Sequence, residues 1–85
     1  MNFSFSKHVL EELDERNIPR SLVEQVLQAP EQKVQELENI ICYQSRVEIN
    51  GKLYLLRVMV NETVNPPKVV TAYRTGKINK YWRNP

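Results

Sequence analysis

The sequence predicts an α+β domain in which two N-terminal helices pack on a three- to four-stranded antiparallel sheet. Three features indicate this fold class: two short amphipathic segments before residue 30, an alternating apolar run over 39–61 that turns at Asn50-Gly51, and a β-rich segment over 68–74. The 85 residues are enough for one small hydrophobic core but not for two. Residues 1–85 are therefore expected to form a single domain.

The run over 39–61 is predicted to be a β-hairpin. Asn-Gly between β-branched and aromatic residues favours a type I′ turn, because both central residues of that turn need a positive φ. A two-residue turn at Asn50-Gly51 sets the register and places Tyr43 opposite Val58 on a mostly apolar face. The other face then carries Arg46 and Arg57 as diagonal neighbours, roughly 7 Å apart. Two adjacent guanidiniums are unfavourable unless an anion lies between them, so this face is a candidate anion-binding site.

Two helices are expected before the hairpin. Ser6 is predicted to cap the first helix, which ends near Arg16. Ser21 and Glu24 have the spacing of a capping box and are predicted to begin the second helix, which Pro30 ends. Each helix is too short to be stable alone, so both must dock their apolar stripes on the apolar face of the sheet.

Two further strands flank the hairpin in the sequence. The segment 32–37 is mostly polar, which is typical of an edge strand. Pro66-Pro67 cannot donate backbone hydrogen bonds and marks a loop before the β-rich segment 68–74. Since no tight turn sets the register of that last strand, both Tyr73 and Arg74 are candidates for the face that carries the arginine pair.

Charge is distributed unevenly along the chain. Residues 1–42 hold four bases and eight acids, a net charge of −4, whereas residues 43–85 hold eight bases and two acids, a net charge of +6. If the C-terminal half forms one surface, that surface would attract a polyanion. The competing interpretation is that a short domain shows such an asymmetry by chance.

Bases and aromatic residues also interleave in the C-terminal half. Such a mixture suits single-stranded nucleic acid, because cations bind phosphates while rings stack on unpaired bases. The alternative is that the aromatic residues anchor the core while the bases stay solvated, and we favour this alternative for Tyr43 and Tyr54. For Arg46 and Arg57 we favour the functional interpretation.

Other reactive side chains are few. His8 is the one imidazole and could act as a general acid or base, although Glu11 and Glu12 at i+3 and i+4 also fit an ion-paired surface histidine. Cys42 opposite Met59 is predicted to be a small buried hydrophobic residue rather than a nucleophile.

No cofactor or metal is expected, because the sequence has no phosphate-binding glycine loop and no metal-ligand spacing. No membrane partner is expected either. No targeting segment and no run of apolar residues long enough for a membrane span is present, which predicts a cytoplasmic protein.

The order of these parts resembles the DUF4258 family over nearly the whole chain. The likeness lies in the segments 6–8 (Ser-Lys-His), 15–18 (Glu-Arg-Asn-Ile), 23–30 (V-x-x-V-L-x-x-P) and 69–73 (Val-Val-Thr-Ala-Tyr). That family is grouped with the RelE/ParE-like toxins. The chain departs from the family at Glu12, where arginine is frequent, and at Asn17, where glycine is usual.

The resemblance implies a RelE-like toxin, held in check by an antitoxin, that cleaves free or ribosome-bound messenger RNA without a metal ion. On this basis Arg46 and Arg57 would stabilise charge that develops on the scissile phosphate. His8 would be a second-tier candidate for the general acid. Two other functions remain open, namely a non-catalytic nucleic-acid- or protein-binding module and a ParE-type gyrase inhibitor.

The candidate site residues form two groups. The catalytic candidates carry or stabilise charge and protons, and they are Arg46, Arg57, His8, Lys80 and Tyr81. The nucleic-acid-binding candidates combine bases and rings of the last strand and the tail, and they are Arg74, Tyr73, Lys77, Trp82 and Arg83.

Overall fold

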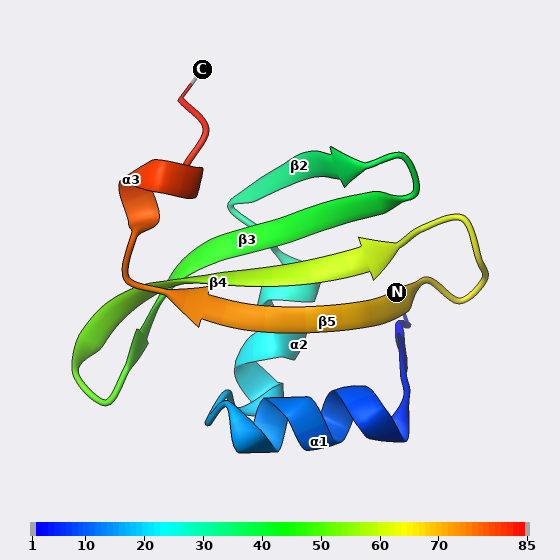
Figure 1. Ribbon diagram of the computed structural model, residues 1–85, viewed down its shortest axis with the longest axis horizontal. Helices are drawn as coiled ribbons and strands as arrows, with labels where there is room; N and C mark the ends of the chain where they lie inside the picture. The colour runs from blue at the N-terminus through cyan, green and yellow to red at the C-terminus, as the bar shows by residue number, and fades with distance from the viewer. Residues whose placement is uncertain (1, 85) are drawn as a thin grey trace.

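The computed structural model describes residues 2–84, which form a five-stranded sheet and three short helices (Figure 1). The elements in chain order are β1 (Ser4–Phe5), α1 (Lys7–Glu15), α2 (Arg20–Gln28), β2 (Gln32–Leu37), β3 (Ile40–Ile49), β4 (Lys52–Asn61), β5 (Lys68–Thr75) and α3 (Ile78–Tyr81). The strand order across the sheet is β1-β5-β4-β3-β2, so β2 is an edge strand as predicted.

The predicted fold class is wrong in its sheet and in its helices. The sheet has five strands instead of three or four, and it is mixed because β1 pairs with β5 in parallel, Ser4 with Lys68 and Phe5 with Val69. A third helix, α3, follows the last strand, so the helices are not confined to the N-terminal part. The sequence could not show these elements, because a two-residue strand and a single helical turn are too short to display a periodicity.

The β3–β4 hairpin has the predicted register. Asn50 and Gly51 form its turn with positive φ values of 52° and 76°, and Tyr43 pairs with Val58 as expected. The same register places Gln44 opposite Arg57. Alternate residues of the hairpin therefore face opposite sides of the sheet, and Arg57 is on the side away from Tyr43.

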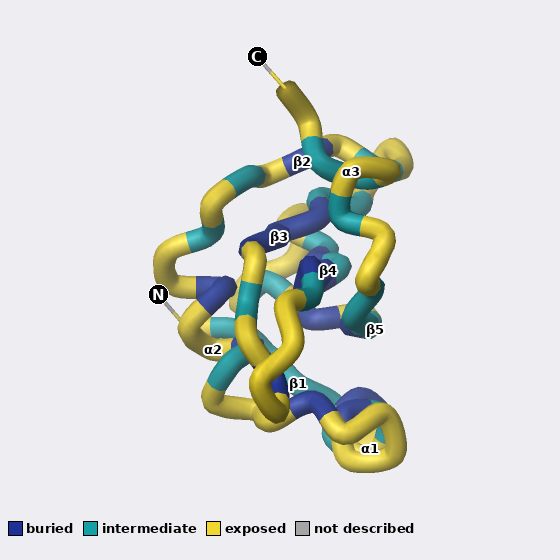
Figure 2. The backbone as a smooth tube through the Cα atoms, turned by 90° about the vertical axis from the view of Figure 1, so that its left-hand side faces the viewer, coloured by how far each residue is buried: buried dark blue, intermediate teal, exposed yellow. Residues whose placement is uncertain are grey.

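The hydrophobic core lies between the sheet and the helices α1 and α2. Figure 2 shows α1 at one end of the view and α3 at the other, with the strands between them. The buried side chains of the core come from α1, α2 and one face of the sheet, and include Val9, Leu13, Val23, Val26, Leu27, Tyr43, Leu56, Val58, Val60, Val69 and Ala72. Tyr43 is thus a core residue, as predicted.

The two helices begin differently. The backbone N–H of Val9 donates to Ser6 Oγ at 3.1 Å, which confirms the predicted cap of α1. The predicted capping box of α2 is wrong, because the helix begins at Arg20 after Pro19 and has no side-chain cap. Glu24 instead accepts from Arg20 Nε at 2.8 Å, an i,i+4 pair on the helix surface.

The turn between α1 and α2 contains Asn17 with a φ of 55°. Glycine adopts this left-handed conformation without strain, and asparagine tolerates it better than most residues. The departure from the family pattern at this position is therefore compatible with the same backbone.

The register of β5 decides which of its side chains shares a face with Arg57. Tyr73 pairs with Arg57 and Arg74 pairs with Leu56, after a register shift between Met59 and Val60. Tyr73 therefore lies on the face that carries Arg57, whereas Arg74 lies on the face that carries the core.

The outer edge of β5 is covered only in part. The pairing of β1 with β5 stops at Val69, and farther along the edge Arg16 Nη1 donates to the carbonyl oxygen of Ala72 at 2.8 Å. Within residues 2–84 no strand lies along this outer edge of β5 beyond Val69. No helix of this part of the chain has the length and apolar character that a membrane crossing requires.

Candidate functional site

Arg57 lies at the centre of a buried polar cluster on the face of the sheet opposite α1 and α2. Its Nε donates to Gln44 Oε1 at 2.8 Å, its Nη1 donates to the hydroxyl of Tyr73 at 2.6 Å, and its Nη2 forms an ion pair with the carboxylate of Glu36. Only 4% of the Arg57 side chain is exposed. The positive charge is therefore neutralised within the protein, and the guanidinium has little room for an external anion.

Helix α3 closes over this cluster. The guanidinium carbon of Arg57 lies 4.4 Å from the centroid of the Tyr81 ring and 5.7 Å from that of Tyr73. Gln44 Nε2 donates to the carbonyl oxygen of Tyr81 at 3.2 Å, which ties α3 to β3. Arg57 is thus enclosed by two aromatic rings, an arrangement that stabilises a cation removed from water.

The protonation behaviour of the cluster follows from burial and hydrogen bonding. Burial alone lowers the pKa of Arg57, but the hydrogen bonds to Tyr73 and Glu36 outweigh it and the pKa rises above its usual value. Burial raises the pKa of Tyr73, although the donation from Arg57 opposes this. Burial also raises the pKa of the Cys42 thiol to about 11, so this fully buried residue is not a nucleophile.

Arg46 shares the face with Arg57, but it has its own carboxylate. Its Nε and Nη2 donate to the two oxygens of Glu31 at 3.2 and 2.8 Å, and the Arg46 backbone N–H donates to the same carboxylate at 2.7 Å. These hydrogen bonds lower the pKa of Glu31. The guanidinium also stacks on Trp82, 4.4 Å from the ring centroid. The anions beside the arginine pair are therefore two glutamates of the protein itself.

The remaining cations differ in whether a carboxylate lies nearby. Five of the twelve Lys and Arg side chains form ion pairs within 4.0 Å, namely Arg16, Arg20, Lys33, Arg46 and Arg57. The other seven have no carboxylate at this distance within residues 2–84, and they are Lys7, Lys52, Lys68, Arg74, Lys77, Lys80 and Arg83.

Five of these seven unpaired cations come from the β3–β4 turn, the end of β5, and α3 with its flanking residues. Figure 1 shows the β3–β4 turn, the end of β5 and α3 on the left, whereas α1 and β5 begin on the right. We call the left-hand surface the basic end, and it comprises Lys52, Tyr54, Arg74, Lys77, Lys80, Trp82 and Arg83. Its lysines and Arg83 are exposed, and its other three residues are half-buried. Elsewhere in the described part of the chain the unpaired cations are Lys7 and Lys68, at the starts of α1 and β5.

Tyr54 and Lys52 belong to this surface, although the sequence did not identify them as site residues. The Arg74 guanidinium stacks on the Tyr54 ring at 4.8 Å from its centroid, and Lys52 Nζ lies 5.8 Å from the same centroid. The prediction that Tyr54 anchors the core is therefore wrong, because this tyrosine is half-buried and contacts two cations. The sequence could have indicated its exposure, because Tyr54 lies close to the hairpin turn and far from the centre of the hairpin.

His8 is remote from the basic end. It is the second residue of α1, and α1 begins on the opposite side of the molecule from α3 (Figure 1). Its Nε2 lies 3.2 Å from Glu12 Oε2, and 79% of its side chain is exposed. His8 is thus a surface residue beside Glu12, and the structure does not bring it together with Lys80 or Tyr81.

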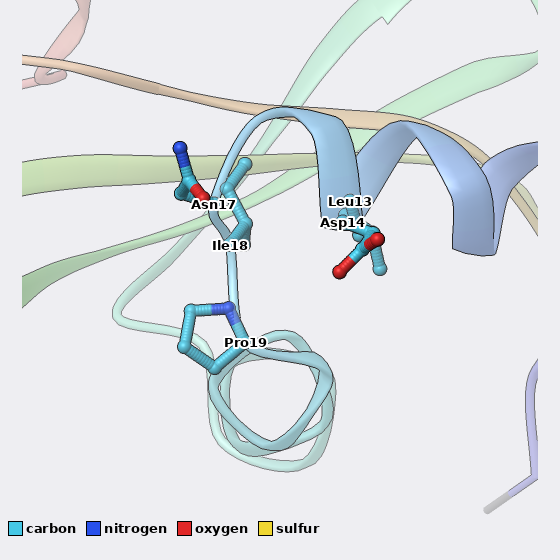
Figure 3. Close-up of a pocket in the computed structure, with 5 residues that line it drawn as sticks. All are labelled: Leu13, Asp14, Asn17, Ile18 and Pro19. Carbon is cyan, nitrogen blue, oxygen red and sulfur yellow. The ribbon is translucent and has the colours of Figure 1, made fainter.

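One pocket of the described chain includes Glu36, the partner of Arg57, in its lining, whereas other pockets lie away from the basic end. Figure 3 shows one of about 290 Å³ at the turn between α1 and α2, lined by Leu13, Asp14, Asn17, Ile18 and Pro19. This pocket contains one carboxylate and no cation or nucleophile. Among residues 2–84 no three His, Cys, Asp or Glu side chains are grouped so that they could hold a metal ion.

Comparison with known proteins identifies the family of the chain. No curated protein and no solved structure matches it. The DUF4258 family, described as a domain of unknown function, matches residues 5–74, a range that includes α1, α2 and most of the sheet but stops before α3. Because this match extends over most of the sequence and agrees with the motifs at residues 6–8 and 69–73, the chain belongs to the DUF4258 family.

Proposed function

We propose that the protein is an RNA-binding toxin of the RelE/ParE-like group that cleaves RNA without a metal ion and binds it at the basic end. The observation that carries the proposal is the gathering of five cations without carboxylate partners at that end, beside half-exposed aromatic rings. The five cations are Lys52, Arg74, Lys77, Lys80 and Arg83.

Unpaired cations favour a polyanion over other ligands. An arginine that already contacts a glutamate must lose that contact before it can bind a phosphate, whereas Lys77 and Lys80 need only release water and counterions. Neutralising five phosphates of a single strand gives a dependence of log affinity on log salt concentration with a slope of about −3.5. Such a steep salt dependence is the expected signature of the basic end.

The aromatic residues favour RNA with unpaired bases. Tyr81, the last residue of α3, and Trp82, which follows it, are half-buried, and Trp82 offers the ring that stacks on Arg46. Bases stack on such rings and on guanidinium planes, so a base can insert beside Trp82 while its phosphates contact Lys80.

The cleavage step needs a cation at the phosphate and a proton donor for the leaving oxygen. When the 2′-hydroxyl oxygen attacks phosphorus, it gives its proton to a water molecule, and a 2′,3′-cyclic phosphate forms as the bond to the 5′ oxygen breaks and that oxygen takes up a proton. Lys77 and Lys80 supply the exposed charge. Tyr73 is our candidate for this donor, because its hydroxyl oxygen accepts from Arg57, which fixes the position of the hydroxyl group. Arg57 then acts as a positioning residue.

A protein partner follows from the same surface. A toxin whose RNA-binding cations are exposed is neutralised most directly by an acidic segment that covers them. We therefore expect an antitoxin with carboxylates that contact Arg74, Lys77 and Lys80.

The second candidate function is a non-catalytic RNA-binding module. The observation that favours it is the pairing of Arg46 with Glu31 and of Arg57 with Glu36, because these ion pairs occupy the two cations expected to stabilise the scissile phosphate.

The test is to express the wild type and a variant in which four cations of the basic end are neutralised. The variant carries Lys52→Gln, Arg74→Gln, Lys77→Gln and Lys80→Gln, and the matched control carries Lys7→Gln and Lys68→Gln. We expect the wild type and the control to slow growth and shorten cellular RNA, whereas the variant leaves both unchanged.

Each outcome has one meaning for the proposal. Slowed growth with intact RNA and inhibited DNA supercoiling would indicate a gyrase inhibitor and overturn the proposal. Normal growth and intact RNA with the wild type, together with salt-dependent RNA binding in vitro, would select the non-catalytic module. Equal RNA cleavage by the variant would show that the basic end is not the site.

A further inference from the structure

We infer that a single RNA strand passes over the open edge of β5 at Thr75-Gly76 and contacts cations on both faces of the sheet. This inference rests on the proposed function, and it adds the path and the conformation of the bound RNA. It also assigns binding roles to Lys52 and Tyr54, on the face of the sheet that carries the core.

The basic end consists of two clusters on opposite faces of the sheet. Tyr54 pairs with Val47 and Arg74 pairs with Leu56, so the cluster of Lys52, Tyr54 and Arg74 is on the face that carries the core. Its contacts are the stacking distances of 4.8 Å for Arg74 and 5.8 Å for Lys52.

The second cluster consists of residues in and next to α3, and it lies on the face of the sheet opposite the core. Tyr81 stacks on Arg57 and Trp82 stacks on Arg46, and both arginines point away from the core. The unpaired cations Lys77 and Lys80 therefore accompany rings on the opposite side of the sheet from Tyr54.

The route between the clusters is open. Only residues 75–76 separate Arg74, on one face, from Lys77, which begins the segment on the other face. In the described chain no strand lies along the outer edge of β5 here, the edge opposite β4, because β1 pairs only as far as Val69. A Cβ atom added at Gly76 would meet nothing within 4 Å. The backbone of a ligand can therefore lie directly against this edge.

A flexible single strand can follow this route, but a duplex cannot. An A-form duplex is a stiff rod with its phosphates on a convex surface, so it reaches cations on one face of a sheet at a time. A single strand bends at each nucleotide and can contact Arg74 and Lys77 together. The protein is therefore expected to prefer single-stranded over double-stranded RNA of the same sequence.

The experiment compares two double variants by the anisotropy of a labelled single-stranded RNA of about 12 nucleotides. Lys52→Gln with Arg74→Gln removes the cations of one face, and Lys77→Gln with Lys80→Gln removes two on the other. Each is expected to flatten the salt slope by about 1.4 and to weaken binding by roughly one order of magnitude at 0.1 M salt. Lys7→Gln with Lys68→Gln is the control, because it also removes two unpaired cations and should change neither quantity.

A second pair of variants tests the crossing point itself. Gly76→Glu places a carboxylate at the open edge, where the structure has room for a side chain and no positive φ to oppose it. We expect Gly76→Glu to weaken single-strand binding by at least several-fold, whereas Gly76→Gln, of nearly the same size, weakens it much less.

The results separate this inference from the proposed function. If the wild type binds no RNA, the proposed function is wrong and the inference goes with it. If RNA binds and only one of the two double variants weakens it, the strand stays on one face and the inference alone is overturned. Equal affinity for the duplex, or equal effects of Gly76→Glu and Gly76→Gln, overturns it as well.

Discussion

Arg57 and Arg74 lie on adjacent strands of one sheet, and both stack on tyrosine rings, yet their environments differ. Arg57 is 3% exposed, forms an ion pair with Glu36 and is enclosed by two rings. Arg74 is half-buried, stacks on Tyr54 and has no carboxylate within 4.0 Å in the described chain. The guanidinium of Arg57 is therefore a structural group, whereas the charge of Arg74 is available to a ligand.

The comparison shows that a count of cations does not locate a binding site. A buried guanidinium with a carboxylate partner is needed for the integrity of its surroundings, since removing it leaves buried polar groups without partners. A cation without such a partner contributes little to folding and keeps its charge for a ligand. Five predictions test this distinction.

The largest effect is expected for Arg57→Ala. This variant leaves the carboxylate of Glu36 and the amide of Gln44 without their partner, so the free energy of unfolding should fall by about 3–5 kcal/mol. Urea denaturation followed by the fluorescence of Trp82, the one tryptophan of the chain, measures this change. Adding Glu36→Gln to Arg57→Ala should restore part of the loss, because the stranded charge is removed. A loss below about 1 kcal/mol would show that Arg57 is not a structural group.

The second effect concerns the ring that covers Arg57. Tyr81→Ala removes the stacking contact and admits water to the guanidinium, which should lower the free energy of unfolding by about 1–2 kcal/mol. Tyr81→Phe keeps the ring and should be close to the wild type in the same urea titration. Equal losses for the two variants would assign the effect to the hydroxyl group and not to the stacking.

The third effect is the pH dependence of the pair formed by Glu31 and Arg46. The pKa of Glu31 is lowered in the folded state, so its contribution to stability is present above the ordinary pKa of the carboxyl and is lost as the pH falls through the lowered value. The pair is about half exposed, so the contribution is below about 1 kcal/mol. Acid titrations should show a smaller loss of stability for Glu31→Gln than for the wild type.

The same substitution turns Arg46 into a cation like Arg74. Once Glu31→Gln removes the carboxylate, Arg46 is free to bind a phosphate, and the slope of the salt dependence of RNA binding should become steeper by about 0.7. An unchanged slope in the anisotropy titration would mean that Arg46 does not face the bound RNA.

The smallest effect on stability is expected for Arg74→Ala. Only the stacking on Tyr54 is lost, so the free energy of unfolding should change by about 1 kcal/mol or less. RNA binding should weaken in the same protein, and this contrast with Arg57→Ala is the sharpest test of the comparison. A loss of stability as large as that of Arg57→Ala would show that both arginines are structural.

Local signals in the sequence were sufficient to predict the β3–β4 hairpin and its register. The positive φ values of Asn50 and Gly51 belong to a two-residue turn, and such a turn leaves one register, with Tyr43 opposite Val58. The cap of α1 at Ser6 was equally local. The start of α2 was predicted wrongly, because Pro19 is the extended N-cap residue and the helix begins at Arg20, one residue before the predicted cap Ser21.

The sequence did not distinguish available cations from neutralised ones. Glu36 lies 21 residues from Arg57, and Glu31 lies 15 residues from Arg46, so neither pairing could be seen as a local spacing. The pairing of β1 with β5 and the closure of α3 over β3 and β4 are likewise contacts between segments that lie far apart in the sequence.

The sequence by itself determined that Arg46 and Arg57 share one face of the sheet, because a tight turn and the two-residue repeat of a β-strand are local properties. Only the tertiary structure decided that Glu31 and Glu36 occupy these arginines while Arg74 and the lysines of the tail stay unpaired. The physical reason is that charge pairing and burial depend on distances between segments remote in sequence, and the packing of the whole chain sets those distances.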